Sequence, residues 1–185
     1  MTTARRTNKG PSAAAGNRAA ILAAARTIFA ENGFDAPLSA IARTAGVGQG
    51  VLYRHFPNRE AIALAVFDDN IAEIEARAAD PGRSLGELLN MIVEQLTDSA
   101  ALIALIDPES TFDARLTEPA TRLFVLISGK IDDPAQRGDV RTEATAADVI
   151  MALSMLAALL TKTDPSCREQ VSRQAWNILS HGLFR

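Results

Sequence analysis

The sequence predicts an all-α protein, and two features of its composition support this prediction. Apolar residues make up 48% of the chain, with Ala and Leu abundant among them, whereas aromatic residues make up only 5%. This mixture suits closely packed helices better than a sheet, which is richer in β-branched and aromatic residues. A third feature is the spacing of the apolar residues, which recur at intervals of three and four. At 185 residues the chain is long enough for two small lobes or one larger domain.

Residues 1–16 are predicted to be a flexible basic arm. They contain three basic residues, no acidic residue and too little apolar surface to fold alone. Such an arm either lies along a DNA backbone or in its minor groove, or it is a solvated tail that aids the encounter with DNA. Asn17 is a suitable N-cap for a first helix that ends near Asn32, where Gly33 stops it.

The stretch from Ser39 to Arg59 is predicted to form two short helices around the turn Gly46-Val47-Gly48. In the second helix Leu52 and Phe56 are four residues apart and face inward. A helix-turn-helix places its second helix in the DNA major groove, so polar side chains are expected on the outer face. The alternative is a plain helical hairpin, whose solvated face would more often carry Glu and Lys. The residues predicted to project outward are Gln49, Tyr53, Arg54 and His55.

At these residues the chain resembles the TetR family of bacterial transcriptional repressors. The resemblance rests on IARTAGVGQGVLYRHF followed by NREAI, behind a first helix that ends in FAENGF, and it covers about residues 17–67. It implies a three-helix, helix-turn-helix DNA-binding domain in residues 17–63. It also implies a ligand-binding and dimerisation domain in residues 64–185, and release of DNA when a small molecule binds.

The candidate DNA-binding residues either read bases or contact phosphate. Gln49 is placed to pair with adenine, and Arg54 is placed to reach either guanine or a phosphate. Val51 either meets a thymine methyl group or packs inside, and Gly50 allows the backbone to approach DNA closely. The hydroxyl of Ser39 can bind a phosphate at the positive end of a helix. The resemblance adds four further candidates. Gly48 stands at the start of the second helix, and the positions of Tyr53, His55 and Arg59 contact phosphate in the family.

The charge of the chain is distributed unevenly. Residues 1–60 carry eight Lys or Arg and three acidic residues, a net charge of +5, whereas the remaining residues carry −8. A basic segment on an acidic protein is typical of nucleic-acid binding, because contacts to phosphate dominate the affinity. Accidental clustering is the alternative, but the basic third is also the third that contains the predicted helix-turn-helix.

The C-terminal part is predicted to contain further helices and a dimer interface. The helix from Arg59 to about Ala79 either transmits the ligand signal, as the resemblance implies, or acts as a rigid spacer, and the loop at residues 80–83 ends it. The helix predicted at 142–161 is apolar on nearly every side, which indicates a partner. We expect a homodimer through residues 142–161 and 166–183, which suits a palindromic operator. The other helices of this part are predicted at 84–97 and 119–131.

Large, adaptable apolar side chains of the C-terminal part are candidates for a small-molecule pocket. Such residues line ordinary cores far more often. The acidic balance of this part slightly favours a cationic or a neutral apolar ligand, although a solvated acidic surface explains it equally well. The candidate ligand-binding residues are Met91, Phe112, Phe124, Met151, Met155 and Trp176.

No pattern in the sequence indicates an enzyme, a metal site or a cofactor. His55 and His181 have no ligand partner at helical spacing, and no phosphate-binding loop, dinucleotide fingerprint or nucleophile elbow occurs. The single Cys167 fits a reducing compartment, and no apolar run is long enough to cross a bilayer. We therefore expect a cytoplasmic DNA-binding regulator. The alternative is a helical small-molecule-binding or interaction protein without functional DNA recognition.

Overall fold

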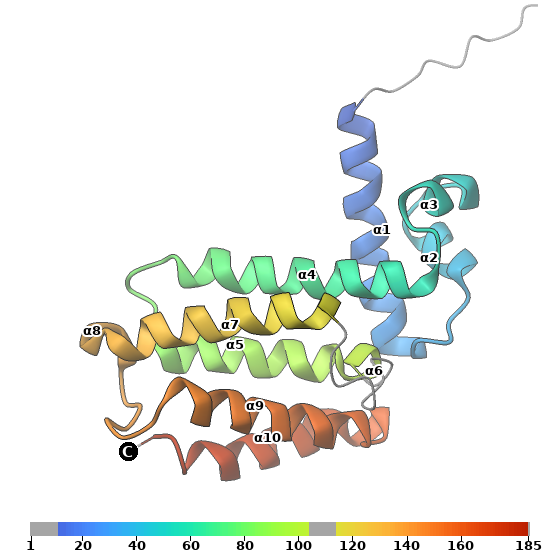
Figure 1. Cartoon of the computed structure of the whole chain (residues 1–185). Helices are drawn as coiled ribbons and strands as arrows, with labels where there is room; N and C mark the ends of the chain where they lie inside the picture. Colours follow the sequence, from blue (N-terminus) through green and yellow to red (C-terminus); the bar gives the residue numbers. More distant parts are fainter. Residues whose placement is uncertain (1–10, 104–113, 185) are drawn as a thin grey trace, which may run out of the picture. The chain divides into compact units, whose positions relative to one another are not determined.

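The computed structural model describes residues 11–103 and 114–184, and within them it consists of helices joined by turns (Figure 1). No strand occurs in this part, although an isolated antiparallel bridge joins Val140 to Phe184. The predicted all-α fold is confirmed. None of the described helices is long and apolar enough to cross a membrane. The chain divides into two compact units, Met1–Val66 and Phe67–Arg185.

The N-terminal unit contains α1 (Pro11–Asn32), α2 (Leu38–Thr44), α3 (Gln49–His55) and the start of α4 (Arg59–Ala78). Helix α1 packs against both α2 and α3, which also contact each other. Each helix contributes apolar residues at spacings of three and four, so that one stripe of each is buried. The core residues of this unit include Ile21, Ala25, Phe29, Ile41, Leu52, Phe56, Ile62 and Val66.

The first helix is longer than predicted, because it begins at Pro11 and not at Asn17. Proline suits the first position of a helix, where its missing N–H has no partner in any case. The alanines that follow have the highest helix propensity of any residue. Residues 11–16 of the predicted arm are therefore helical, and residues 1–10 lie outside the described part of the chain.

The C-terminal unit is a helical bundle. Its main helices are α5 (Leu85–Asp98), α7 (Ala114–Asp132), α9 (Ala146–Thr161) and α10 (Arg168–Ser180). Helix α5 contacts the other three, and α9 lies beside α10 (Figure 1). The residues of α4 from Phe67 onward also belong to this unit. Its short helical elements are α6 (Ala100–Ile103), α8 (Pro134–Arg137) and the 3₁₀ turn η1 (Pro165–Cys167).

Capping residues set two of the helix boundaries in this unit. Ser84 and Glu87 form a capping box at the start of α5. Thr145 and Asp148 form a second box, so that α9 begins at Ala146 and not at residue 142. The capping oxygens satisfy backbone N–H groups that have no partner inside the helix.

Two further helix boundaries differ from the prediction. Helix α7 begins at Ala114, so that Pro119, the predicted start, lies in its second turn. A proline at this position removes one backbone hydrogen bond of the helix and crowds the carbonyl of the preceding turn. Helix α10 begins at Arg168, after the turn that Pro165 introduces, and it ends at Ser180.

Candidate functional site

The turn between α2 and α3 is held by hydrogen bonds that require a glycine. Gly46 has a φ of 67°, a left-handed conformation that residues with a side chain rarely adopt. Its N–H donates to the carbonyl of Arg43 at 3.1 Å, and the N–H of Val47 donates to the carbonyl of Ala42 at 3.0 Å. This pair of bonds is the Schellman motif, which closes a helix. Helix α2 therefore ends at a defined point, and α3 starts shortly afterwards at Gln49.

Helix α3 buries one side and exposes the other. Leu52 is 1% exposed and Phe56 is 4% exposed, and both belong to the core of the N-terminal unit. The opposite side carries hydrogen-bonding groups in contact with solvent, including the phenol of Tyr53, which is 52% exposed. The exposed residues of α3 among the DNA-binding candidates are Gln49, Gly50, Tyr53 and Arg54.

The remaining candidates near α3 differ in their exposure. Ser39, in the first turn of α2, and Gly48, the N-cap of α3, are both exposed. Val51 and His55 are only half-buried, so that they lie at the edge of the exposed face. The His55 ring is 6.3 Å from the ring of Phe56, centroid to centroid. His55 is therefore less free to project outward than its spacing in the sequence predicts.

Arg59 is engaged with the protein itself. Its Nη1 donates to the carbonyl oxygen of Phe34 at 2.5 Å and lies 3.5 Å from Oδ1 of Asp35. Its guanidinium carbon is 5.1 Å from the centroid of the Phe34 ring, within the range of a cation–π contact. The side chain is only 25% exposed. Arg59 thus ties the start of α4 to the loop after α1, a contact that spacing along the chain could not show.

Arg18 is a cation near α3 that sequence reasoning did not single out. Its guanidinium carbon lies 5.4 Å from the centroid of the Phe56 ring, at the end of α3. The residue is exposed on α1, so the contact leaves its charge accessible to solvent. The Nε of Arg54 donates to the carbonyl of Gly50 at 3.1 Å, which orients a second exposed guanidinium on α3. The contact of Arg18 joins two helices, and no local sequence pattern signals it.

The C-terminal unit contains an apolar cavity of about 360 Å³. Its walls come from α4, α5, α6, α7 and α9, and they include Phe67, Leu96 and Leu153. This volume lies in the lower part of the range of small-molecule sites, which are concave and mostly apolar. Five helices that are separated in sequence therefore build one apolar pocket, which opens to solvent beside the exposed Ser154.

None of the predicted pocket residues that the structure describes lines this cavity. Met151 and Met155 are 62% and 56% exposed, and Phe124 is 44% exposed. Met91 is half-buried on α5 and lies outside the cavity wall, and Phe112 lies outside the described residues. Periodicity identifies an apolar face, but it does not identify which neighbouring element covers that face.

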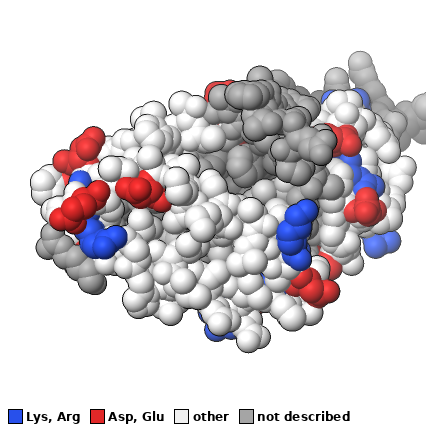
Figure 2. Space-filling model, turned by 60° about the horizontal axis from the view of Figure 1, so that its bottom comes forward, with Lys and Arg blue, Asp and Glu red and all other residues white. Residues whose placement is uncertain are grey.

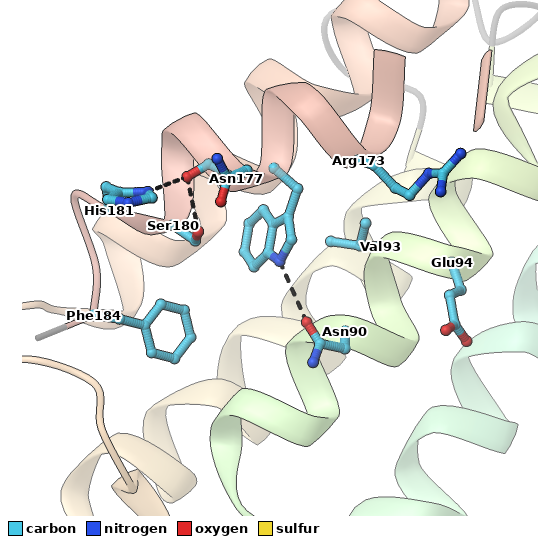
Figure 3. Close-up of a pocket in the computed structure, with 9 residues that line it drawn as sticks. Asn90, Val93, Glu94, Arg173, Asn177, Ser180, His181 and Phe184 are labelled. Carbon is cyan, nitrogen blue, oxygen red and sulfur yellow. Dashed lines mark hydrogen bonds between the residues drawn. The ribbon is translucent and has the colours of Figure 1, made fainter. Parts of the chain in front are cut away.

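Trp176 lines a different feature, an open groove of about 770 Å³ between α5 and α10. Its indole Nε1 donates to Oδ1 of Asn90 at 3.4 Å, as the dashed line in Figure 3 shows. Glu94 and Arg173 lie together at one end of this groove, and Phe184 lies at the other (Figure 3). Polar and charged side chains make this groove chemically unlike the apolar cavity.

Arg122 joins α7 to α4 through two carboxylates. Its Nε and Nη2 donate to the two carboxylate oxygens of Glu75 at 2.8 and 2.6 Å, and its Nη1 donates to Asp68 at 2.5 Å. The hydrogen bonds from Arg122 lower the pKa of Glu75, although its partial burial acts in the opposite direction. The same bonds raise the pKa of Arg122 above its ordinary value. Glu75 and Arg122 therefore both remain charged at neutral pH.

An exposed apolar surface lies on α9 and α10. Met151, Met155 and Leu159 are spaced four residues apart on α9, and Ile178 on α10 is 67% exposed. We call these four residues the α9/α10 face. Figure 2 shows this side of the C-terminal unit, where the surface over α9 and α10 is mostly uncharged. Exposed apolar surfaces of this kind are typical of contacts between proteins.

Metal-binding side chains are not gathered in the part of the chain that the structure describes, where no three His, Cys, Asp or Glu residues form a possible site. The two histidines, His55 and His181, belong to different units. Cys167 is exposed and unbridged.

The N-terminal unit defines a class of protein. Two short helices are joined by a closed glycine turn, packed on a third helix, and the second of them presents an exposed polar face, which is the architecture of a helix-turn-helix protein. A family model described as bacterial regulatory proteins of the tetR family matches residues 21–66. The chain belongs to the TetR family of bacterial regulators, as the sequence motif predicted.

Similar proteins extend the comparison beyond the matched segment. The chain is 28% identical to the HTH-type transcriptional regulator UidR of Escherichia coli (strain K12) over 141 residues, which cover 70% of this chain and 72% of UidR. It is 29% identical to the HTH-type transcriptional repressor KstR of Rhodococcus jostii (strain RHA1) over 110 residues, which cover 58% of this chain and 47% of KstR.

A solved structure also resembles the whole fold. The TetR transcriptional regulator SCO0520 from Streptomyces coelicolor superimposes with a TM-score of 0.61 and 29% identity, over 90% of this chain and 98% of that one. The likeness includes the C-terminal unit, which the family model does not reach. The family is one of regulators, which are generally not enzymes.

Proposed function

We propose that the protein is a sequence-specific DNA-binding transcriptional regulator of the cytoplasm. In this proposal it acts as a repressor that leaves its operator when a small-molecule effector binds to the C-terminal unit. The exposed polar face of α3 carries the proposal, because a helix-turn-helix inserts this face into the major groove. The relatives that are named as an HTH-type regulator and a repressor support the same role.

Gln49 and Arg54 are the proposed base-reading residues, since an amide can pair with adenine and a guanidinium with guanine. The exposed hydroxyl groups of Ser39 and Tyr53 are proposed to bind phosphates on either side of the groove. Arg18 adds a cation beside the end of α3. The net charge of +5 in residues 1–60 supports this assignment, because it favours a polyanion.

The remaining DNA-binding candidates are proposed to contribute by close contact with the DNA or by holding the site in place. The absence of side chains at Gly48 and Gly50 lets the start of α3 approach the DNA backbone. Val51 and His55, at the edge of the exposed face, would meet the groove wall. Arg59 is proposed to contribute mainly by holding the loop at Phe34, because its guanidinium is already bonded there.

We further propose that the two parts of the chain have different functions. Residues 17–63 bind DNA, and residues 64–185 bind the effector and form the dimer. The division of the fold between Val66 and Phe67 supports a boundary near this point. Since α4 runs through that boundary as one helix, a change in its C-terminal part is proposed to reach the DNA-binding unit along the helix.

The protein is proposed to act as a homodimer through α9 and α10, in the region predicted at residues 142–161 and 166–183. The α9/α10 face supports this, because it leaves four large apolar side chains exposed in a single chain. Two such helices from each of two chains would form a four-helix interface. A two-fold dimer carries two copies of α3, which suits a palindromic operator.

Selection of bound sequences from a random DNA pool tests the proposed function. We expect a palindromic consensus whose binding weakens steeply with salt. Gln49→Ala and Arg54→Ala should each weaken binding to that consensus by about 5- to 150-fold, the cost of one base contact.

Arg77→Ala serves as the matched control, because Arg77 is an exposed arginine on α4 that pairs with Glu73 and belongs to the C-terminal unit, and it should leave DNA binding unchanged. A pool that yields no consensus, with weak and uniformly salt-sensitive binding, would favour the alternative of a small-molecule-binding protein without DNA recognition.

A further inference from the structure

We propose that the cavity of the C-terminal unit selects an uncharged, mainly apolar effector and rejects ionised molecules of the same shape. This inference rests on the proposed function, since it treats the cavity as the effector site. It goes further, because it excludes organic acids and amines that are charged at neutral pH. The acidic composition favours a cationic or a neutral ligand, and the cavity leaves only the neutral one.

The walls of the cavity supply almost no polar groups. Phe67, Ile92 and Leu123 are among nine apolar side chains that line it, and Ser154 is the one hydroxyl among the described lining residues. Ser154 is itself exposed, so the hydroxyl lies where the cavity meets solvent. The wall therefore offers a ligand a large apolar contact and a single side-chain hydrogen bond near the opening.

Charged residues close to the cavity in sequence are already paired with each other. Asp68 follows the lining residue Phe67, and Arg122 precedes the lining residue Leu123. Arg122 donates hydrogen bonds to both Asp68 and Glu75, so each charge has a partner within the protein. Within the described residues, no charged side chain lines the cavity as a counter-charge for a ligand.

Helix α9 keeps the cavity separate from the exposed apolar face. Its lining residues Ile150, Leu153, Ser154 and Ala157 follow the spacing of three and four that defines one helical face. The α9/α10 face uses the adjoining positions Met151, Met155 and Leu159 on the same helix. One helix thus presents one surface to the cavity and another to solvent.

The selectivity follows from the cost of burying a charge. An apolar ligand gains free energy because both its surface and the wall leave water. An ionised group against the same wall loses its hydration and meets no counter-charge among the lining residues that the structure describes, so its burial is strongly unfavourable. Two ligands of equal shape that differ by one charged group should therefore differ in affinity by at least tenfold.

Two fluorescent naphthalenes form such a pair. N-phenyl-1-naphthylamine is uncharged, and 1-anilinonaphthalene-8-sulfonate adds a sulfonate to nearly the same skeleton. Titration of the full chain is expected to show one neutral molecule bound per chain, with the sulfonate bound at least tenfold more weakly. Equal affinity for the two, or no binding of the neutral molecule, would overturn the proposal.

Two alanine variants of the C-terminal unit show whether binding occurs in the cavity. Ala157→Phe fills part of the wall and should weaken binding of the neutral molecule by at least tenfold, whereas Ala72→Phe, at an exposed position of α4 outside the wall, should not. If both variants behave alike, the dye binds elsewhere and the proposal is wrong.

Ser154→Lys tests the role of charge directly. It introduces a cation at the exposed edge of the wall, where its hydrophilic head can remain hydrated. Binding of the sulfonate should become tighter by up to about fivefold, the range of a solvent-exposed ion pair, and an unchanged preference for the neutral molecule contradicts the proposal.

Binding of each variant to the selected DNA consensus is measured in parallel without dye. Retained DNA binding together with absent dye selectivity refutes only this inference. Loss of specific DNA binding by the unmodified protein refutes the proposed function instead.

Discussion

Replacement of Arg122 by Gln should destabilise the C-terminal unit, because it removes the charged link between α7 and α4. The change removes two charge-assisted hydrogen bonds to Glu75 and one to Asp68. Such bonds contribute about 1.5–3 kcal/mol when shielded from solvent, whereas exposed ion pairs contribute about 0.2–1 kcal/mol.

The exposure of the partners decides between these magnitudes. The side chain of Arg122 is 28% exposed and that of Glu75 is 36% exposed, whereas that of Asp68 is 62% exposed. The two-pronged contact with Glu75 should therefore dominate. We expect a total loss of about 1–2 kcal/mol in the free energy of unfolding, equivalent to a decrease of roughly 5 °C in Tm.

Trp176 provides the assay. It is the single tryptophan of the chain and lies in the C-terminal unit, so its fluorescence during urea unfolding reports on that unit. The urea midpoint should fall while the slope remains unchanged, because the surface exposed on unfolding is the same. Arg173→Gln is the matched control, since its contact with Glu169 spans 3.7 Å and its side chain is 75% exposed. Equal losses in the two variants would refute the reasoning.

The effect should also depend on pH. Arg122 lowers the pKa of Glu75 in the folded protein, so the stabilisation is fully present above the unfolded pKa of about 4.3. It is lost as the pH falls from there through the lowered pKa, because the native carboxylate then becomes protonated. The difference in stability between the unmodified protein and Arg122→Gln should therefore be constant near pH 7 and shrink below about pH 4. A difference that persists undiminished in strong acid contradicts the assigned ion pair.

Two other changes test the surfaces of the two units. Met155→Asp places a charge on the α9/α10 face and should shift a dimer to a monomer at micromolar concentration, as measured by sedimentation; an unchanged dimer mass would place the interface elsewhere. Arg59→Met removes the bond to the Phe34 carbonyl and should lower the stability of the N-terminal unit by about 1 kcal/mol, followed by the helical circular dichroism of the chain. If this variant instead keeps its stability, and the slope of log affinity for DNA against log salt concentration becomes shallower by about one, Arg59 is a phosphate contact.

The sequence by itself determined the features that depend on local chemistry. Gly46 is the residue type that a left-handed turn requires, so the break between α2 and α3 is visible in the sequence. Leu52 and Phe56 are four residues apart, which fixes the inner side of α3 and leaves Gln49 and Tyr53 outside. The all-α fold, the helix-turn-helix and the family were all predictable for this reason.

The tertiary structure decided which surfaces meet. Spacing marked Met151 and Met155 as apolar but could not show that they lie on an exposed face, because periodicity carries no information about the neighbouring helix. The cavity is assembled from five helices between Phe67 and Ala157, and no local pattern joins them. Arg59 matched a phosphate contact by resemblance, and only the packing of α4 against the loop after α1 placed its guanidinium at Phe34. Contacts between distant segments depend on how the helices pack, which a single sequence does not record.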